Sequence, residues 1–282
     1  MENDLVFTTT QHAIVAHAFA VALGAHVVGF LYFASRTSLL APRYRTATWL
    51  SMAVMAASGL LFYRLGQSWD LAFVQQGEQM VRTGNRFDSG LRYVNWFVTV
   101  PVLLVQVLFA LDLTRQKVLR LRTVLVASGV LMVLCGYVGQ LDARDDGHLL
   151  LWGLLGTLPF VVLLAVLVPL LLAARGALPH EAGQTARSIA FVFVGFWGLY
   201  PIAYLLPALS DSASTAVLAQ VLFTVADIGS KVLYGVLLAK LCRLRSAADG
   251  FAPAREPAQG ALGERPEDEP YPDRRTPGRV SP

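Results

Sequence analysis

Charged residues are scarce in this chain of 282 residues: Asp, Glu, Lys and Arg make up 15% of it, whereas 55% is hydrophobic. Soluble domains carry about 25% charged residues. This deficit, together with a mean hydropathy of +0.53, excludes an ordinary soluble domain and indicates a polytopic membrane protein. The net charge of +4 does not indicate nucleic-acid binding, because the basic residues stand in short clusters between apolar runs instead of on one face.

Cysteine is nearly absent as well. Cys135 and Cys242 lie far apart in the sequence and have no metal-ligand spacing, so neither a disulfide framework nor a zinc site is indicated. The opening residues MENDLVFTTT lack the basic segment that begins a cleavable signal peptide. We therefore expect the first apolar run to remain in the mature protein.

Apolar runs of about 17 to 25 residues, the length that a bilayer-spanning helix needs, occur seven times. They lie at 11–34, 46–65, 92–113, 119–140, 148–174, 187–207 and 215–241. Arg and Lys cluster in alternate connections, and acids such as Asp142, Asp145, Asp146 and Asp211 occupy the others. The positive-inside rule then predicts an external N-terminus and a cytoplasmic C-terminus. The expected fold class is an all-α membrane protein, a seven-transmembrane helix bundle formed by residues 1–245.

Two segments stand outside these runs. Residues 66–90 carry Gly and Asn punctuation between alternating stretches, which predicts a short external hairpin. Residues 246–282 are rich in Pro, Gly, Arg, Glu and Asp, which predicts a disordered cytoplasmic tail.

Two ionisable residues interrupt the last apolar run, VADIGSKVLYGVLLAK, where Asp227 and Lys231 lie one helical turn apart. Charges inside a membrane are costly, so such a pair is expected to face the protein interior and to work there. A buried lysine serves either as half of a structural ion pair or as an amine that forms a Schiff base with a carbonyl compound. The pair alone leaves both readings open.

The third apolar run contains a polar stripe. Arg92, Asn95, Thr99 and Gln106 recur at spacings of three, four and seven residues, which places them on one face of a helix. A single polar stripe in a membrane helix indicates a pathway or a site. For Gln106 alone, a hydrogen bond between helices with no transport role is the other reading.

Three motifs together resemble the microbial (type 1) rhodopsins: RYVNW at 92–96, WGLYP at 197–201 and ADIGSK at 226–231. GYVGQ at 136–140 is most similar to the bacterial sodium- and chloride-pumping branch. The resemblance covers the whole helical region and implies all-trans retinal bound covalently to Lys231, with Asp227 as counterion. It also implies that aromatic and small residues line the polyene: Trp96, Trp197, Tyr200, Pro201, Trp152 and Gly153.

The resemblance also makes the stripe informative about the transported ion. Proton pumps of the family carry carboxylates at the positions of Asn95 and usually of Gln106, and neither is present here. The sodium pumps carry Asn, Asp and Gln at the positions of Asn95, Thr99 and Gln106, and their central Asp accepts the proton. Thr99 has no carboxylate, so that acceptor is missing here. The Asn-Thr-Gln combination is that of the chloride-pumping rhodopsins.

With the Schiff base that the resemblance implies, charge counting also favours an anion. A protonated Schiff base and Arg92 give two positive charges near the chromophore, against Asp227 alone, and unpaired buried charge is expensive. Chloride, held by the Asn95 amide and the Thr99 hydroxyl, would balance the site. We expect a light-driven inward chloride (halide) pump, a transporter and not an enzyme. The alternatives are a sodium or proton pump that uses Asp227 as the sole acceptor, a photosensor, or a seven-helix protein without retinal.

Weaker signals concern partners. His17 is read either as a contact in a trimer or pentamer or as a local helix bond. Trp152 and Gly153 resemble rhodopsins with a gap beside the retinal ring that admits a carotenoid antenna, although glycine is also common at contacts between membrane helices. The expected location is a bacterial inner membrane, which the chain crosses several times, and no nucleic-acid partner is expected.

Overall fold

The computed structural model describes residues 2–111, 113–141 and 146–252, apart from the side chains of residues 175 and 177. Within them, seven helical spans are long and apolar enough to cross a membrane: Thr9–Leu39, Pro42–Ala72, Leu91–Ala110, Arg115–Leu141, Asp146–Ala174, His180–Leu209 and Ala213–Ala248. These spans coincide with the seven predicted runs and confirm the seven-helix bundle. Which end of the bundle faces outward stays a prediction.

The first five spans are each built around one α-helix: α1 (Thr9–Arg36), α2 (Pro42–Ala72), α3 (Leu91–Gln106), α4 (Arg115–Leu141) and α5 (Asp146–Ala177). Short 3-10 turns flank them: η1 (Glu2–Asp4), η2 (Thr37–Leu39) and η3 (Val107–Ala110). Helix α1 begins at a reciprocal capping box between Thr8 and Gln11, and Pro42 opens α2, where its missing N–H leaves no helical bond unmade.

The sixth and seventh spans are interrupted. The sixth consists of α6 (His180–Trp197) and α7 (Leu199–Leu209), which meet at Gly198. The seventh consists of α8 (Ala213–Asp227), the π-helical segment η4 (Ile228–Leu233) and α9 (Tyr234–Ala248). Single π-turns inside α-helices are frequent at functional sites, and η4 contains Lys231.

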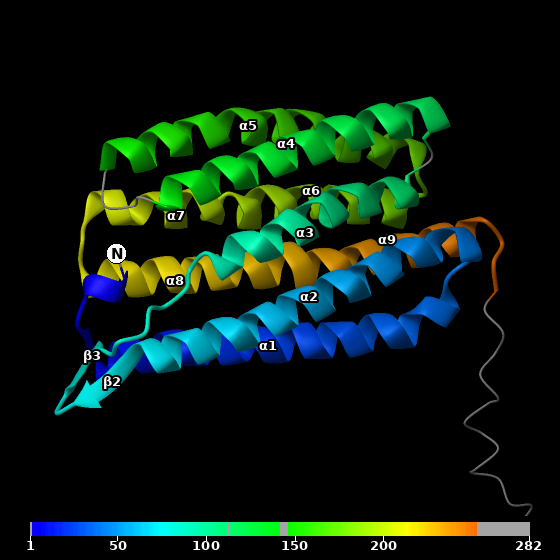
Figure 1. Ribbon diagram of the computed structural model, residues 1–282. Coiled ribbons are helices and arrows are strands. Elements are labelled where there is room, and N and C mark those ends of the chain that lie inside the picture. The colour runs from blue at the N-terminus through cyan, green and yellow to red at the C-terminus, as the bar shows by residue number, and fades with distance from the viewer. Residues whose placement is uncertain (1, 112, 142–145, 253–282) are drawn as a thin grey trace, which may run out of the picture. The chain divides into compact units, whose positions relative to one another are not determined.

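Neighbouring helices in the sequence pack side by side in space, and the last span contacts the first through α1 and α8. The bundle is therefore closed, and Figure 1 shows its helices running along a common direction. Large apolar side chains such as Leu154 and Leu158 are exposed on its outside, while Arg92, Asp227 and Lys231 are buried inside. This arrangement is the one that a lipid environment favours.

The predicted hairpin is present, with one addition. Helix α2 continues to Ala72, and β2 (Phe73–Gln76) then pairs antiparallel with β3 (Gln79–Arg82) around Gly77, whose φ of 64° suits glycine. A third strand, β1 (Phe7–Thr8), pairs with the other edge of β3. The sheet thus joins the N-terminal segment to one end of the bundle (Figure 1).

Some sequence-based expectations fall outside the described residues. Asp142 and Asp145 are among them, and so is most of the predicted tail, since α9 ends at Ala248 and description ends at residue 252. The division into a helical domain and a disordered tail stays a prediction.

Candidate functional site

The pair predicted from the seventh span forms a buried ion pair. The Lys231 Nζ donates to Asp227 Oδ1, and both side chains are at most 1% exposed. The same oxygen accepts the Trp96 Nε1–H at 3.0 Å and the Tyr200 hydroxyl at 2.5 Å, and that hydroxyl lies 2.8 Å from Ser230 Oγ. Asp227 Oδ2, by contrast, has no partner in the structure.

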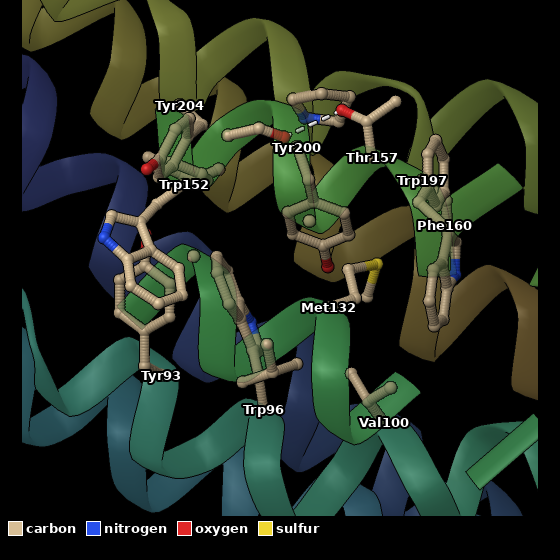
Figure 2. Close-up of a pocket in the computed structure, with 16 residues that line it drawn as sticks. Tyr93, Trp96, Val100, Met132, Trp152, Thr157, Phe160, Trp197, Tyr200 and Tyr204 are labelled. Atoms are coloured by element: carbon tan, nitrogen blue, oxygen red, sulfur yellow. Dashed lines mark hydrogen bonds between the residues drawn. The ribbon is translucent and has the colours of Figure 1, made fainter. Parts of the chain in front are cut away.

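An apolar cavity of about 100 Å³ lies beside this pair. Figure 2 shows aromatic side chains from α3, α5, α6 and α7 around it. The Trp96 and Tyr200 rings meet edge to face with centroids 4.9 Å apart. All six residues expected to line a polyene do line this cavity: Trp96, Trp152, Gly153, Trp197, Tyr200 and Pro201.

The residues present fit retinal, a long apolar aldehyde. The cavity walls are aromatic, and two of them, Trp96 and Tyr200, bond directly to Asp227 at one end. A primary amine, Lys231, is buried at that same end. The unpartnered Asp227 Oδ2 offers an acceptor for a further N–H group.

The polar stripe of α3 is buried: Arg92, Asn95, Thr99 and Gln106 are between 0% and 6% exposed. The Arg92 guanidinium donates to Gln220 Oε1 at 2.7 Å and lies over the Phe223 ring at 4.8 Å. At the other end of the stripe, Gln106 Oε1 accepts the Ser51 hydroxyl at 3.3 Å, and Gln106 Nε2 has no partner.

The central part of the stripe is hydrogen-bonded within the protein. Asn95 Nδ2 donates to Ser58 Oγ at 3.2 Å, and the Thr99 hydroxyl donates to the Asn95 carbonyl at 2.9 Å. An Asn amide nitrogen has two N–H groups, so one of them remains for a ligand. The Thr99 hydroxyl must leave Asn95 O before it can donate to anything else.

Glu2 is a functional candidate that the sequence did not reveal. Gln220 Nε2 donates to Glu2 Oε1 at 2.8 Å, so Glu2, Gln220 and Arg92 form one hydrogen-bonded chain. The charge count from the sequence used Asp227 as the only carboxylate near the chromophore, and Glu2 corrects that count at the Arg92 end. No sequence signal could have found this contact, because 218 positions separate the two residues.

His26 is the second residue that sequence reasoning missed. It is fully buried in α1, where Nδ1 lies 2.7 Å from Ala22 O and Nε2 has no partner. It lies within electrostatic range of Asp227 and Lys231. A histidine inside an apolar run was the signal that singled out His17, and the same signal applies here.

The two weaker candidates occupy different surroundings. His17 is exposed on the outside of α1, which leaves it accessible to a neighbouring molecule. Gly153 lines the cavity, and a Cβ added there would lie 2.9 Å from Tyr204 Cε1. Both readings of Gly153, a gap beside the chromophore and a close helix contact, therefore remain open.

Comparisons with known proteins agree with this geometry. The family model of bacteriorhodopsin-like proteins matches residues 13–244. Archaerhodopsin-1 of Halorubrum ezzemoulense is 27% identical over 241 residues, which cover 83% of this chain and 85% of that protein.

Two solved structures extend the comparison to three dimensions. Xanthorhodopsin, described as a light-driven ion pump with dual chromophore, is 30% identical with a TM-score of 0.82, and a thermophilic rhodopsin is 31% identical with a TM-score of 0.83. Each alignment covers 88% of this chain and 99% of the other. The chain therefore belongs to the microbial rhodopsin family, whose members bind retinal and include light-driven ion pumps.

Proposed function

We propose that this rhodopsin is a light-driven inward chloride pump, with retinal held on Lys231 as a protonated Schiff base. Retinal, when bound, supplies light absorption and an isomerisation that reorients the Schiff base N–H. The protein supplies a fixed counterion in Asp227, which Trp96 and Tyr200 hold by hydrogen bonds. The assignment to the chloride-pumping branch rests on the motif of α3 and on the following charge argument.

The observation that carries the proposal is that the described part of the core holds a single buried acid. Among the described residues, Asp227 is the only buried carboxylate. The stripe residues Asn95, Thr99 and Gln106 end in amides and a hydroxyl, which neither take nor return a proton at physiological pH. A two-carboxylate proton relay across the core is therefore not available, whereas hydrogen-bond donors suited to an anion are.

The contacts also favour one end of the stripe for the anion. Glu2 compensates part of the Arg92 charge through Gln220, which leaves less positive charge for an anion to balance at that end. The case for an anion near Lys231 therefore rests on the hydrogen-bond donors there. There, the remaining Asn95 N–H and the Thr99 hydroxyl can converge on a halide once the hydroxyl turns away from Asn95 O. A halide at that place would stand beside the Schiff base and accept hydrogen bonds from these donors.

Between Thr99 and the Gln106 end of the stripe, the buried polar groups are neutral. Thr48 Oγ1 and Gln106 Nε2 are buried without partners, and Ser51 joins Gln106. Tyr234 donates to Leu103 O at 2.8 Å and packs beside them. These groups offer donors to a passing anion without a competing carboxylate, which supports transport from the Schiff base toward the Gln106 end.

Chloride titration of the retinal-loaded protein in sulfate buffer tests this proposal. Chloride should shift the visible absorption band saturably, and illuminated cells in sodium chloride should alkalinise their medium, more strongly with a protonophore. In sodium sulfate the light response should vanish. A band that does not respond to chloride, together with full transport in sulfate, would reject the anion pump.

A proton pump is the second candidate, because two titratable groups flank the site. His26 Nε2 is a free acceptor near the Asp227–Lys231 pair, and Glu2 ends the chain from Arg92. Under this alternative, illumination acidifies the medium in sulfate and a protonophore abolishes the signal. His26→Phe should then stop transport, whereas an anion pump should retain most of its activity in the same variant.

We also propose that a carotenoid antenna binds beside Gly153. Gly153 lines the cavity, and the similar xanthorhodopsin has a dual chromophore. Excitation of an added hydroxylated carotenoid should drive transport in the unchanged protein. Gly153→Trp should remove that response and leave the response to direct excitation of retinal.

A further inference from the structure

A second cavity lies away from the chromophore, between the end of α1 with η2 and the first half of α9. Its volume is about 180 Å³. Figure 1 places the C-terminal ends of α1 and α9 at the end of the bundle opposite the β-strands. Both spans finish here, at Leu39 and Ala248, so the cavity opens where the transmembrane helices reach the membrane boundary.

Three cations line this cavity: Arg36, Lys240 and Arg243. In the described part of the chain, none of them forms an ion pair, and no acid lines the cavity. The Arg36 guanidinium lies over the Tyr32 ring, 5.4 Å from its centroid, which holds it at the cavity.

Neighbouring arginines at the same end are already satisfied. Arg43 pairs with Asp249 at 2.7 Å, and Arg245 Nε donates to the Tyr44 hydroxyl at 3.2 Å. The described acid of this region, Asp249, is therefore engaged, and it also accepts the Tyr44 hydroxyl. No described acid neutralises the three cations at the cavity, so they can bind an anion from outside the protein.

The walls of the cavity are apolar. The rest of the lining is Tyr32, Leu39, Leu40, Val236 and Ala239, of which Leu40 and Ala239 are buried. A free inorganic anion would use the cations but not these walls, whereas a lipid would use both. Basic pockets between transmembrane helices are known to suit anionic head groups.

We propose that this cavity binds one anionic phospholipid. Arg36, Lys240 and Arg243 surround its phosphate, and the apolar walls contact its glycerol backbone and first methylene groups. The expected strength follows from charge, since each basic residue near an anionic surface contributes about fivefold in affinity. Loss of all three should weaken binding on the order of a hundredfold.

Native mass spectrometry of the purified full chain, titrated with phosphatidylglycerol or phosphatidylcholine, tests the proposal. The unchanged protein should bind one phosphatidylglycerol in preference to phosphatidylcholine, and R36Q/K240Q/R243Q should lose that preference. The matched control is R115Q/K117Q/R120Q, which removes the same two Arg and one Lys from an exposed cluster at the same end and should keep the affinity within about twofold of the unchanged protein.

A variant that leaves every charge in place separates a built cavity from diffuse attraction. Val236→Trp fills the apolar wall and should also displace phosphatidylglycerol, while both glutamine variants should keep the visible absorption band. If the two glutamine variants lose phosphatidylglycerol binding equally, general surface charge and not the cavity attracts the lipid. Displacement of the lipid by equimolar inorganic phosphate would assign the cavity to a free anion, and either result would overturn the proposal.

Discussion

The Asp227 carboxylate is used unevenly, and this asymmetry is informative at the scale of single residues. Oδ1 accepts from Lys231, Trp96 and Tyr200, whereas Oδ2 has no partner. An unpaired buried carboxylate oxygen is costly, so a further hydrogen-bond donor or a cation is expected on that side. The N–H of a retinal Schiff base on Lys231 would meet this requirement by turning to Oδ2. A halide would not, because it accepts hydrogen bonds and is repelled by a carboxylate, so the unpartnered oxygen supports the chromophore and not the anion.

Replacement of the amine tests the anchor directly. Lys231→Ala should give a protein without a visible absorption band after incubation with retinal, because the Schiff base has no nitrogen to form on. Lys240→Ala removes an exposed lysine nine residues further along the same span and should keep the band. A coloured Lys231→Ala protein would refute the assignment.

Glu2→Gln tests the chain that leads to Arg92. The substitution keeps a hydrogen-bond acceptor for Gln220 but removes a negative charge from the Arg92 end of the site. Chloride affinity should rise about fivefold, as expected for the loss of roughly 1 kcal/mol of repulsion, and titration of the absorption band measures it. Asp4→Asn, which changes the same charge beside Arg82, should have little effect; a fall in affinity for Glu2→Gln would contradict the charge argument.

At the scale of elements, the seven spans were predictable because apolar length and polar periodicity are local properties of the sequence. The stripe of α3 followed from spacing alone, and all its members are buried. The π-helical segment η4 and the pairing of β1 with β3 were not predictable. They depend on contacts between distant parts of the chain, and so do the bonds of Glu2 and the surroundings of His26.

Gly229 shows how such a distant contact shapes the element that carries Lys231. A Cβ at Gly229 would overlap the Phe196 ring of α6. Gly229→Ala should therefore destabilise the protein by about 1–3 kcal/mol, measured as faster thermal bleaching of the visible band. Gly195→Ala in α6, where a Cβ meets nothing within 4 Å, should be neutral or slightly stabilising.

A compensating change makes this test specific. Phe196→Leu combined with Gly229→Ala relieves the overlap and should recover part of the lost stability. If the double variant bleaches as fast as Gly229→Ala alone, the overlap with Phe196 is not the cause of the lost stability.

At the scale of the whole molecule, the direction of pumping depends on how the bundle is inserted. The Gln106 end of the stripe lies toward the clusters of Arg and Lys, and the β-strands with Glu2 lie at the other end. The positive-inside rule places the basic end in the cytoplasm. Movement of an anion from the Schiff base toward Gln106 is inward only if that orientation holds.

Labelling from one side of the membrane decides the orientation. Glu78→Cys, exposed at the turn between β2 and β3, should react with a membrane-impermeant maleimide in intact cells, whereas Gln116→Cys at the start of α4 should react only after permeabilisation. Both variants are made in a Cys135→Ser, Cys242→Ala background, because the chain has those two thiols. The reverse pattern would turn the same chemistry into an outward anion pump, since the polar stripe fixes a path within the protein and insertion alone fixes its sign.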